Sequence, residues 1–187
     1  MATKVYIDQG HNPVNPNAGA EGNGYREQDL VYTIGVLTAQ FLNAAGIETR
    51  LSRPTEETQL GTSVSSSLAA RVQDANSWGA DYFVSLHANA SEITSASGSE
   101  AYVFSQNSAA VPLAENILNQ LNINTGLQDR GVFSRPSLYV LRRTAMPATL
   151  IELGFITNPY DAELMANSPE LFAAGVANGI LAFLGRL

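Results

Sequence analysis

Short apolar runs rich in β-branched and aromatic residues alternate with segments of helical periodicity along most of this chain. We expect a strand at each of these runs, which lie at residues 4–8, 47–52, 81–86, 99–104, 138–141 and 148–153. We expect helices over the periodic segments at 27–45, 67–78, 109–121, 159–165 and 169–184. This alternation predicts an α/β fold of three layers, in which helices flank a mostly parallel sheet.

The composition is that of a globular chain with an acidic balance. The 187 residues, 45% of them hydrophobic, are enough for one core, and we expect residues 1–187 to form a single domain. The net charge is −7 and no basic run exceeds two residues. We therefore expect neither nucleic acid nor an anionic membrane surface as a partner. Because there is no cysteine, disulfides and thiolate metal sites are excluded.

Both histidines of the chain lie where a predicted strand ends. His11 comes shortly after the run at 4–8, within VYIDQGHNP, and His87 ends YFVSLH. Ligands of open α/β sheets gather outside the carboxyl ends of the strands, so two histidines in this position favour a metal site. A lone histidine at a strand end is more often an ordinary hydrogen-bonded residue, and further ligands are needed to support a metal.

An acidic residue is the expected third ligand, and Glu27 is the best placed. It begins the first predicted helix after a loop at 12–26 that is dense in Asn, Pro and Gly, so it can fold back beside His11. Two imidazoles, one carboxylate and an open fourth position are the arrangement of catalytic zinc in hydrolases. In the alternative interpretation, Glu27 is only a favourable partner of the helix dipole.

Glu152 is the expected general base. It interrupts the apolar run ATLIELGF, where an ionisable group without a partner is costly, and it lies at the end of the predicted strand 148–153. A carboxylate beside a metal-bound water can take its proton and later return it to a leaving amine. Alternatively, the side chain of Glu152 only points out of the core at the end of the strand and forms an ion pair with Arg142 or Arg143. We expect Asp8 either to support the ligands through a hydrogen bond or to cap the adjacent turn.

Three segments resemble one known family in the same order along the chain. They are VYIDQGHNP with GAEGNGYREQDL, then ANSWGADYFVSLHANA, then LYVLRRTAMPATLIELGFITNPYDAELM. From about Lys4 to the C-terminus they resemble the zinc-dependent N-acetylmuramoyl-L-alanine amidases of the Gram-positive autolysin and spore-lysis type, often called amidase type 3. The resemblance implies that His11, Glu27 and His87 bind Zn²⁺. It further implies that Glu152 is the catalytic glutamate and that the sheet is twisted and mixed, with about six strands.

The activity implied by the resemblance is hydrolysis of one amide bond in peptidoglycan, between the lactyl group of N-acetylmuramic acid and the L-alanine of the stem peptide. Zinc would polarise the carbonyl group and lower the pKa of the attacking water toward about 7. Glu152 would act first as base and then as acid. The sequence departs from the usual first motif of the family, because Gln9 stands before Gly10 and no glycine follows His11 directly.

Two other classes of function stay open on the sequence. One is a non-catalytic module that binds the wall on an amidase fold, which Glu152 argues against, because a binder has no use for a general base. The other is a different zinc hydrolase, such as a peptidase or a sugar deacetylase. The bond that is cleaved in purified wall would separate all three.

Peptidoglycan is the expected partner, and the bacterial cell wall or the extracellular space is the expected location. Because a wall with teichoic acids is anionic, an acidic domain gains no electrostatic attraction from it, and we expect a separate wall-binding module in the full-length protein. We expect a monomer. No export signal precedes Val5, so the chain either lacks one or is the catalytic domain of a longer protein. An exported autolysin, a phage endolysin and a mother-cell lysin all fit.

Overall fold

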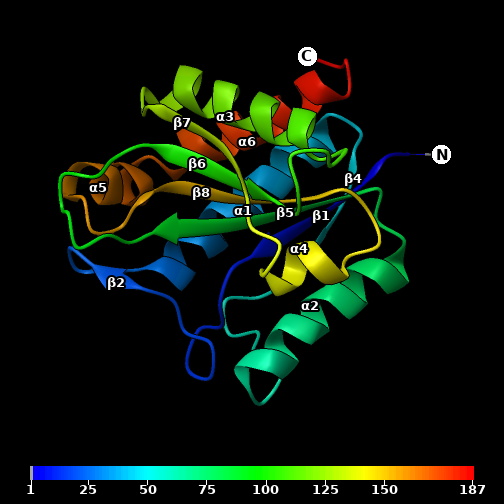
Figure 1. Ribbon diagram of the computed structural model, residues 1–187, viewed down its shortest axis with the longest axis horizontal. Helices are drawn as coiled ribbons and strands as arrows, with labels where there is room; N and C mark the ends of the chain where they lie inside the picture. Colours follow the sequence, from blue (N-terminus) through cyan, green and yellow to red (C-terminus); the bar gives the residue numbers. More distant parts are fainter. Residues whose placement is uncertain (1) are drawn as a thin grey trace.

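The computed structural model describes residues 2–187, in which strands and helices alternate (Figure 1). Its strands are β1 (Lys4–Gln9), β2 (Glu21–Gly22), β3 (Tyr25–Arg26), β4 (Glu48–Leu51), β5 (Tyr82–Asn89), β6 (Ser99–Val103), β7 (Asp129–Ser134) and β8 (Ala148–Phe155). Its helices are α1 (Glu27–Ala44), α2 (Val64–Trp78), α3 (Val111–Thr125), α4 (Tyr139–Arg143), α5 (Pro159–Asn167) and α6 (Pro169–Phe183). The α/β fold predicted from the alternation is confirmed.

The sheet has six strands in the order β4-β1-β5-β8-β6-β7. The first four of these are parallel to one another, β6 runs antiparallel to β8, and β7 runs parallel to β6. The sheet is therefore mixed and mostly parallel, as expected. The carboxyl ends of β1, β5 and β8 consequently meet at one edge of the sheet, which is where α/β folds place their sites.

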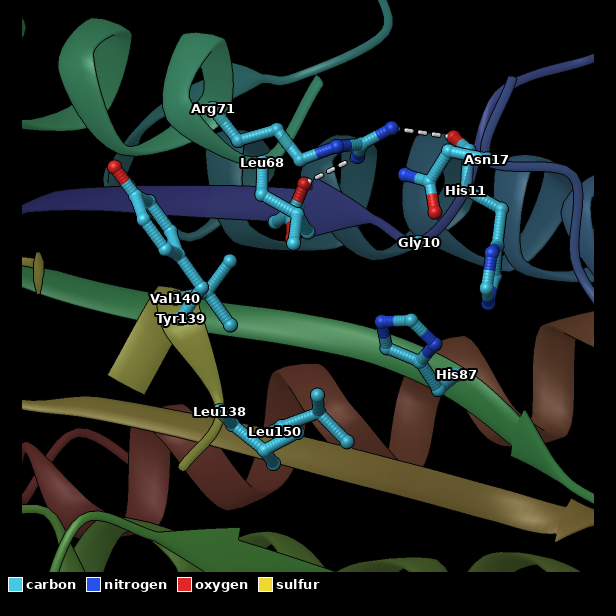
Figure 2. Close-up of a pocket in the computed structure, with 11 residues that line it drawn as sticks. Gly10, His11, Asn17, Leu68, Arg71, His87, Leu138, Tyr139, Val140 and Leu150 are labelled. Atoms are coloured by element: carbon cyan, nitrogen blue, oxygen red, sulfur yellow. Dashed lines mark hydrogen bonds and ion pairs between the residues drawn. The ribbon is translucent and has the colours of Figure 1, made fainter. Parts of the chain in front are cut away.

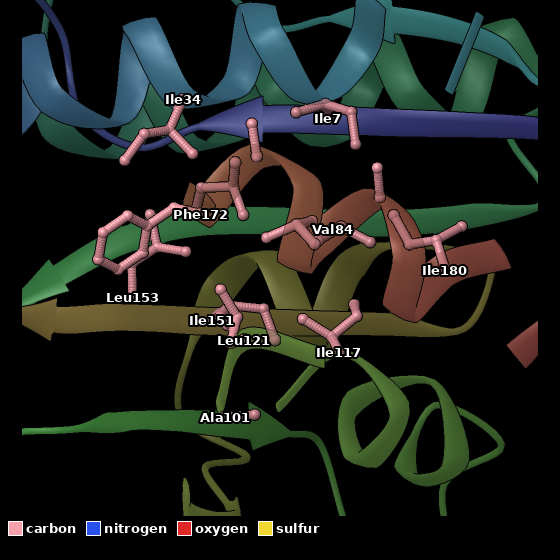
Figure 3. Close-up of a cluster of buried hydrophobic side chains, with 14 of the residues drawn as sticks. Ile7, Ile34, Val84, Ala101, Ile117, Leu121, Ile151, Leu153, Phe172 and Ile180 are labelled. Atoms are coloured by element: carbon pink, nitrogen blue, oxygen red, sulfur yellow. The ribbon is translucent and has the colours of Figure 1, made fainter. Parts of the chain in front are cut away.

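Helices cover both faces of the sheet (Figure 1). On one face, α1, α3 and α6 contribute Ile34, Ile117 and Ile180 to the larger hydrophobic cluster, and all three side chains are fully buried (Figure 3). On the other face, α2 and α4 contribute Val72 and Val140 to a smaller cluster. Burial of apolar area on both faces of the sheet is what stabilises the three layers. None of the helices in residues 2–187 has the length and apolar character that crossing a membrane requires.

Two segments of the predicted secondary structure are wrong. The run at 138–141 is not a strand, because it forms the start of α4, and β7 is a strand in a segment where we expected none. The strand expected at 99–104 is confirmed as β6, which runs antiparallel to β8 and lies between β8 and β7, so β7 forms an edge of the sheet. The loop at 12–26 also contains the short hairpin of β2 and β3, which the sequence did not predict.

Candidate active site

The ends of β1 and β5 bring the two histidines of the chain together with Glu27. His11 follows β1 by two residues, His87 lies near the end of β5, and Glu27 is the first residue of α1. His11 Nε2 lies 3.1 Å and His87 Nδ1 lies 2.9 Å from the same oxygen, Oε1 of Glu27. One ligand atom from each of the three residues lies within 4.8 Å of the other two. The three residues predicted as metal ligands therefore form one cluster.

The cluster has the donor set of a zinc site. A carboxylate oxygen only accepts hydrogen bonds, so both ring nitrogens that face Oε1 must carry a proton to make these contacts. A divalent cation takes the place of such protons, because it binds the neutral imidazole nitrogen and the carboxylate directly. Two nitrogens and one oxygen that converge in this way fit Zn²⁺, with room for a further ligand on the cavity side.

Backbone and side-chain hydrogen bonds hold Glu27 in place. Its Oε2 accepts from the backbone N–H of Ala20 at 2.9 Å, and its Oε1 accepts from that of Ala88 at 3.1 Å. Burial alone would raise the pKa of the Glu27 carboxyl, but hydrogen bonds from His11 and His87 hold it well below its ordinary range. Glu27 is therefore a carboxylate at neutral pH, which is the form that binds a metal.

Two glycines allow the backbone to approach the cluster closely. A Cβ atom at Gly10 would lie 2.6 Å from Nε2 of His87, and one at Gly19 would lie 2.8 Å from Oε2 of Glu27. Neither distance leaves room for a methyl group, so any larger residue must displace a member of the cluster. The glycine before His11 is thus a packing requirement of the site.

His11 itself adopts a left-handed backbone conformation with a φ of 66°, which is unusual for a residue other than glycine. Its carbonyl oxygen accepts a hydrogen bond from Nη2 of Arg71, which reaches over from α2 (Figure 2). Nη1 of Arg71 donates to the carbonyl oxygen of Gln9 at 2.6 Å and to Oδ1 of Asp8 at 2.6 Å. One guanidinium thus ties together the end of β1 and the loop that carries His11.

Asp8 acts on the site through Arg71. Its Oδ2 accepts from the Ser85 hydroxyl at 2.7 Å, and within residues 2–187 it has no hydrogen bond to the three clustered residues. Burial would raise the pKa of the Asp8 carboxyl, but the Arg71 guanidinium and the Ser85 hydroxyl hold it below its ordinary range. Asp8 therefore fixes the cation that orients the His11 loop.

Loss of the Asp8–Arg71 pair should destabilise the fold. Both side chains are 1% exposed, so Arg71→Met leaves an uncompensated buried carboxylate and should lower the free energy of unfolding by about 3–5 kcal/mol. Arg50→Met is the matched control, because its pair with Asp74 is largely exposed and should contribute at most about 1 kcal/mol. Urea denaturation of the two variants measures the difference. Equal small losses in both would contradict the assigned role of Arg71.

Glu152 lies beside the cluster on the neighbouring strand. In the sheet it is paired with His87 of β5 on one side and with Glu100 of β6 on the other. With His11 and His87 it lines a cavity of about 320 Å³. Its Oε2 is buried and has no hydrogen-bond partner in residues 2–187, so it makes no pair with Arg142 or Arg143. The Glu152 carboxyl therefore has no protein partner that would hold its proton, and it lines the cavity in which a bound molecule could exchange one.

The surroundings of Glu152 favour its protonated form. Burial raises the pKa of the Glu152 carboxyl to about 8, and the nearby carboxylates of Glu27 and Glu100 add to the rise, while Arg135 opposes it. Perturbed carboxyl groups of this kind are typical of general acids and bases. β8 continues to Phe155, so Glu152 lies within the strand and not at its end as the sequence predicted.

The cavity wall includes residues that the sequence did not single out. Tyr102 and Arg135 line the cavity with Glu152. Tyr102 belongs to the predicted run at 99–104, two positions from Glu100, so the alternation of a strand could have placed both on the same face. Arg135 follows β7, which was not predicted, so no sequence signal pointed to it.

A smaller apolar cavity adjoins the two histidines (Figure 2). It measures about 110 Å³. Its apolar wall is formed by Leu68 of α2, Leu138 just before α4, Val140 of α4 and Leu150 of β8. Asp8 and Arg71 form part of its polar side. Such a cavity admits a small uncharged group next to the cluster.

Comparison with known proteins gives one consistent result. The sequence profile of a family described as N-acetylmuramoyl-L-alanine amidase matches residues 5–182. The chain is 36% identical over 182 residues to N-acetylmuramoyl-L-alanine amidase CwlM of Bacillus licheniformis, covering 95% of this chain and 67% of that protein. It is 39% identical over 160 residues to N-acetylmuramoyl-L-alanine amidase LytC of Bacillus subtilis, covering 84% of this chain but only 30% of that protein.

Solved structures agree with the sequence relatives. N-acetylmuramoyl-L-alanine amidase AmiC2 of Nostoc punctiforme superposes with a TM-score of 0.85 at 30% identity, covering 98% of both chains. The fold and the order of the elements are thus shared over nearly the whole chain.

Proposed function

The chain belongs to the N-acetylmuramoyl-L-alanine amidase family, and from this premise we propose that it is a zinc hydrolase that cleaves the amide between the lactyl group of N-acetylmuramic acid and the L-alanine of the stem peptide. One observation carries the proposal: His11, Glu27 and His87 converge on one point, and Glu152, which makes no ion pair within residues 2–187, lines a cavity together with His11 and His87. A ligand set and a proton acceptor side by side are what metal-assisted hydrolysis requires.

In this proposal His11, Glu27 and His87 hold the metal. When bound, Zn²⁺ supplies Lewis-acid chemistry, which polarises the carbonyl group and makes water a better nucleophile. The backbone N–H groups of Ala20 and Ala88 fix the carboxylate of Glu27, so this side chain need not change its position to bind the metal. Arg71 keeps the His11 loop in its left-handed conformation.

Glu152 moves the proton. In its ionised form the Glu152 carboxylate takes a proton from the attacking water, and the raised pKa of the carboxyl then lets it retain that proton at neutral pH. It then gives the proton to the nitrogen of L-alanine, which leaves as a free amine. The glycan keeps the lactyl carboxylate. No serine or cysteine nucleophile is needed.

The bond that is cleaved tests the proposed function directly. Purified peptidoglycan incubated with the protein should gain new amino-terminal L-alanine, detected by labelling of free amines and hydrolysis. Release of acetate would instead identify a deacetylase, other new amino termini a peptidase, and binding to the wall without any product a non-catalytic module. Any of these three results would overturn the amidase assignment.

The relatives also bear on what surrounds this chain in the natural protein. Because the chain spans only 30% of LytC and 67% of CwlM, we propose that residues 1–187 are a catalytic domain that acts together with a separate wall-binding module. The net charge of −7 supports this, since the domain itself has no electrostatic attraction to an anionic wall. We further propose that the domain acts as a monomer, at the cell wall or outside the cell, where its substrate lies.

A further inference from the structure

A single cation borders the catalytic cavity on the side of β6 and β7. Arg135 lines the cavity of about 320 Å³ that also contains His11, His87 and Glu152. Its backbone N–H donates to the carbonyl oxygen of Val103 at 2.8 Å, which ties the segment after β7 to the end of β6. Arg135 also lines the adjoining cavity over Tyr102 and Phe133, so it lies where the two cavities meet.

The guanidinium of Arg135 is held in position by an aromatic ring. Its Cζ lies 4.8 Å from the centroid of Tyr102, which is within the range of a cation–π contact. The ring is fixed in turn, because the Tyr102 hydroxyl donates to Oε1 of Glu100, and Nε of Arg130 donates to Oε2 of the same residue at 2.9 Å. Glu100 is 7% exposed, so this support is part of the packed sheet.

The guanidinium donors of Arg135 make no hydrogen bond within residues 2–187. The other arginines near the site are engaged, since Arg71 pairs with Asp8 and Arg130 with Glu100. Arg135 takes part in no ion pair there, and its guanidinium makes no hydrogen bond to the protein, although the carboxyl of Glu152 lines the same cavity. A positioned guanidinium with free donors presents a fork that matches a carboxylate.

The substrate carries carboxylates on one side of the scissile bond only. The sugars are uncharged, and the lactyl carboxyl is consumed in the amide. The stem peptide has its first free carboxylate on D-glutamate, directly after L-alanine, unless that group is amidated to D-isoglutamine. An extended peptide advances about 3.3–3.6 Å per residue, so this carboxylate lies close enough to the scissile bond to share its cavity.

We propose that Arg135 binds the α-carboxylate of D-glutamate in the stem peptide and makes the protein prefer the unamidated substrate. This inference rests on the proposed function and adds the substrate class to it. It places the peptide on the β6–β7 side of the cavity. Arg135 contributes to substrate binding and leaves the chemical step to the zinc ligands and Glu152.

Paired substrates test the proposal. A muramoyl peptide with D-glutamate and its D-isoglutamine counterpart are compared by KM and kcat. Arg135→Gln should raise KM for the glutamate substrate by about tenfold, the scale of a lost charge-assisted hydrogen bond, and leave KM for the isoglutamine substrate nearly unchanged. Any change in kcat should be the same for both substrates. Arg135→Lys should recover part of the loss. Arg142→Gln, which removes an exposed cation outside both cavities, is the control and should change neither KM.

Three outcomes separate this inference from the proposed function. An equal rise in KM for both substrates in Arg135→Gln, or no preference between them in the wild type, would overturn the role of Arg135. Cleavage of the substrates would still support the proposed amidase function. Cleavage of neither substrate by the wild type would count against the proposed function. In that case the affinities of the free peptides L-Ala-D-Glu-L-Lys and L-Ala-D-isoGln-L-Lys, measured by calorimetry, test the role of Arg135. Tighter binding of the first peptide by the wild type, and loss of this difference in Arg135→Gln, would still support the inference. Equal binding of the two peptides would overturn it.

Discussion

Glu152→Gln should lower the rate of amide cleavage by about 10²–10⁴-fold, the usual contribution of a positioned general acid and base. Glutamine has the same shape as glutamate but accepts no proton at neutral pH, so both proton transfers lose their carrier. Oε2 of Glu152 is buried without a partner, so its loss breaks no hydrogen bond within residues 2–187. Zinc content should be unchanged. Release of L-alanine termini and elemental analysis on the same preparation measure both quantities.

Thermal unfolding distinguishes lost chemistry from lost structure in this variant. Because burial makes the ionised form of Glu152 unfavourable, the neutral glutamine should leave the melting temperature unchanged or raise it. Glu163→Gln, an exposed carboxyl on α5, serves as the matched control and should retain full activity. A Glu152→Gln variant that keeps its fold and cleaves at the wild-type rate would remove Glu152 from the mechanism.

His11→Ala should abolish activity by a different route, through loss of the metal. It removes one of three protein ligands, so the affinity for zinc should fall by more than the roughly 10–100-fold typical of losing a supporting residue around a metal site. Competition with a chelator of known affinity measures this fall independently of catalysis. The two variants are each other's controls, since Glu152→Gln should keep zinc and His11→Ala should not. Zinc bound as tightly by His11→Ala as by the wild type would contradict the assigned ligand set.

The cluster could be predicted because its parts lie at ends of strongly patterned elements. The runs at 4–8 and 81–86 are rich in β-branched and aromatic residues and alternate with helical segments, which favours buried parallel strands, and parallel strands bring their carboxyl ends to one edge. His11 and His87 lie near each other because β1 and β5 are neighbours in this sheet. Glu27 could be predicted as the third ligand because it begins the next helix, and the structure places its carboxylate against both imidazole rings.

The errors in the prediction came from short segments whose structure depends on tertiary packing. LYVL at 138–141 has too few residues for its period to show, and a four-residue apolar run fits a buried turn of helix as well as a strand. β7 contains DRGVFS, whose residues are mostly exposed at the edge of the sheet, so burial imposes no apolar alternation on it. Arg135 follows this strand, and its place in the cavity was beyond reach of the sequence for the same reason.

The supporting contacts of His11 were also beyond the sequence. Arg71 lies 60 residues further along the chain in α2, and only the packing of that helix on the sheet brings its guanidinium to the loop after β1. The apolar periodicity of a helix does not reveal a buried arginine, because a charged residue in the sequence is expected on the exposed face of the helix. Its partner Asp8 likewise reads as an ordinary polar residue at a strand end.

Titration of zinc into chelator-treated wild-type protein, with cleavage of purified peptidoglycan followed at each step, tests whether the cleavage depends on zinc. We expect the metal-free protein to stay folded and to release no L-alanine termini. Activity should return in proportion to added zinc and level off at about one ion per chain, as one ligand cluster requires. Full release of L-alanine termini by folded protein that contains no zinc would show that the amide is cleaved without the metal.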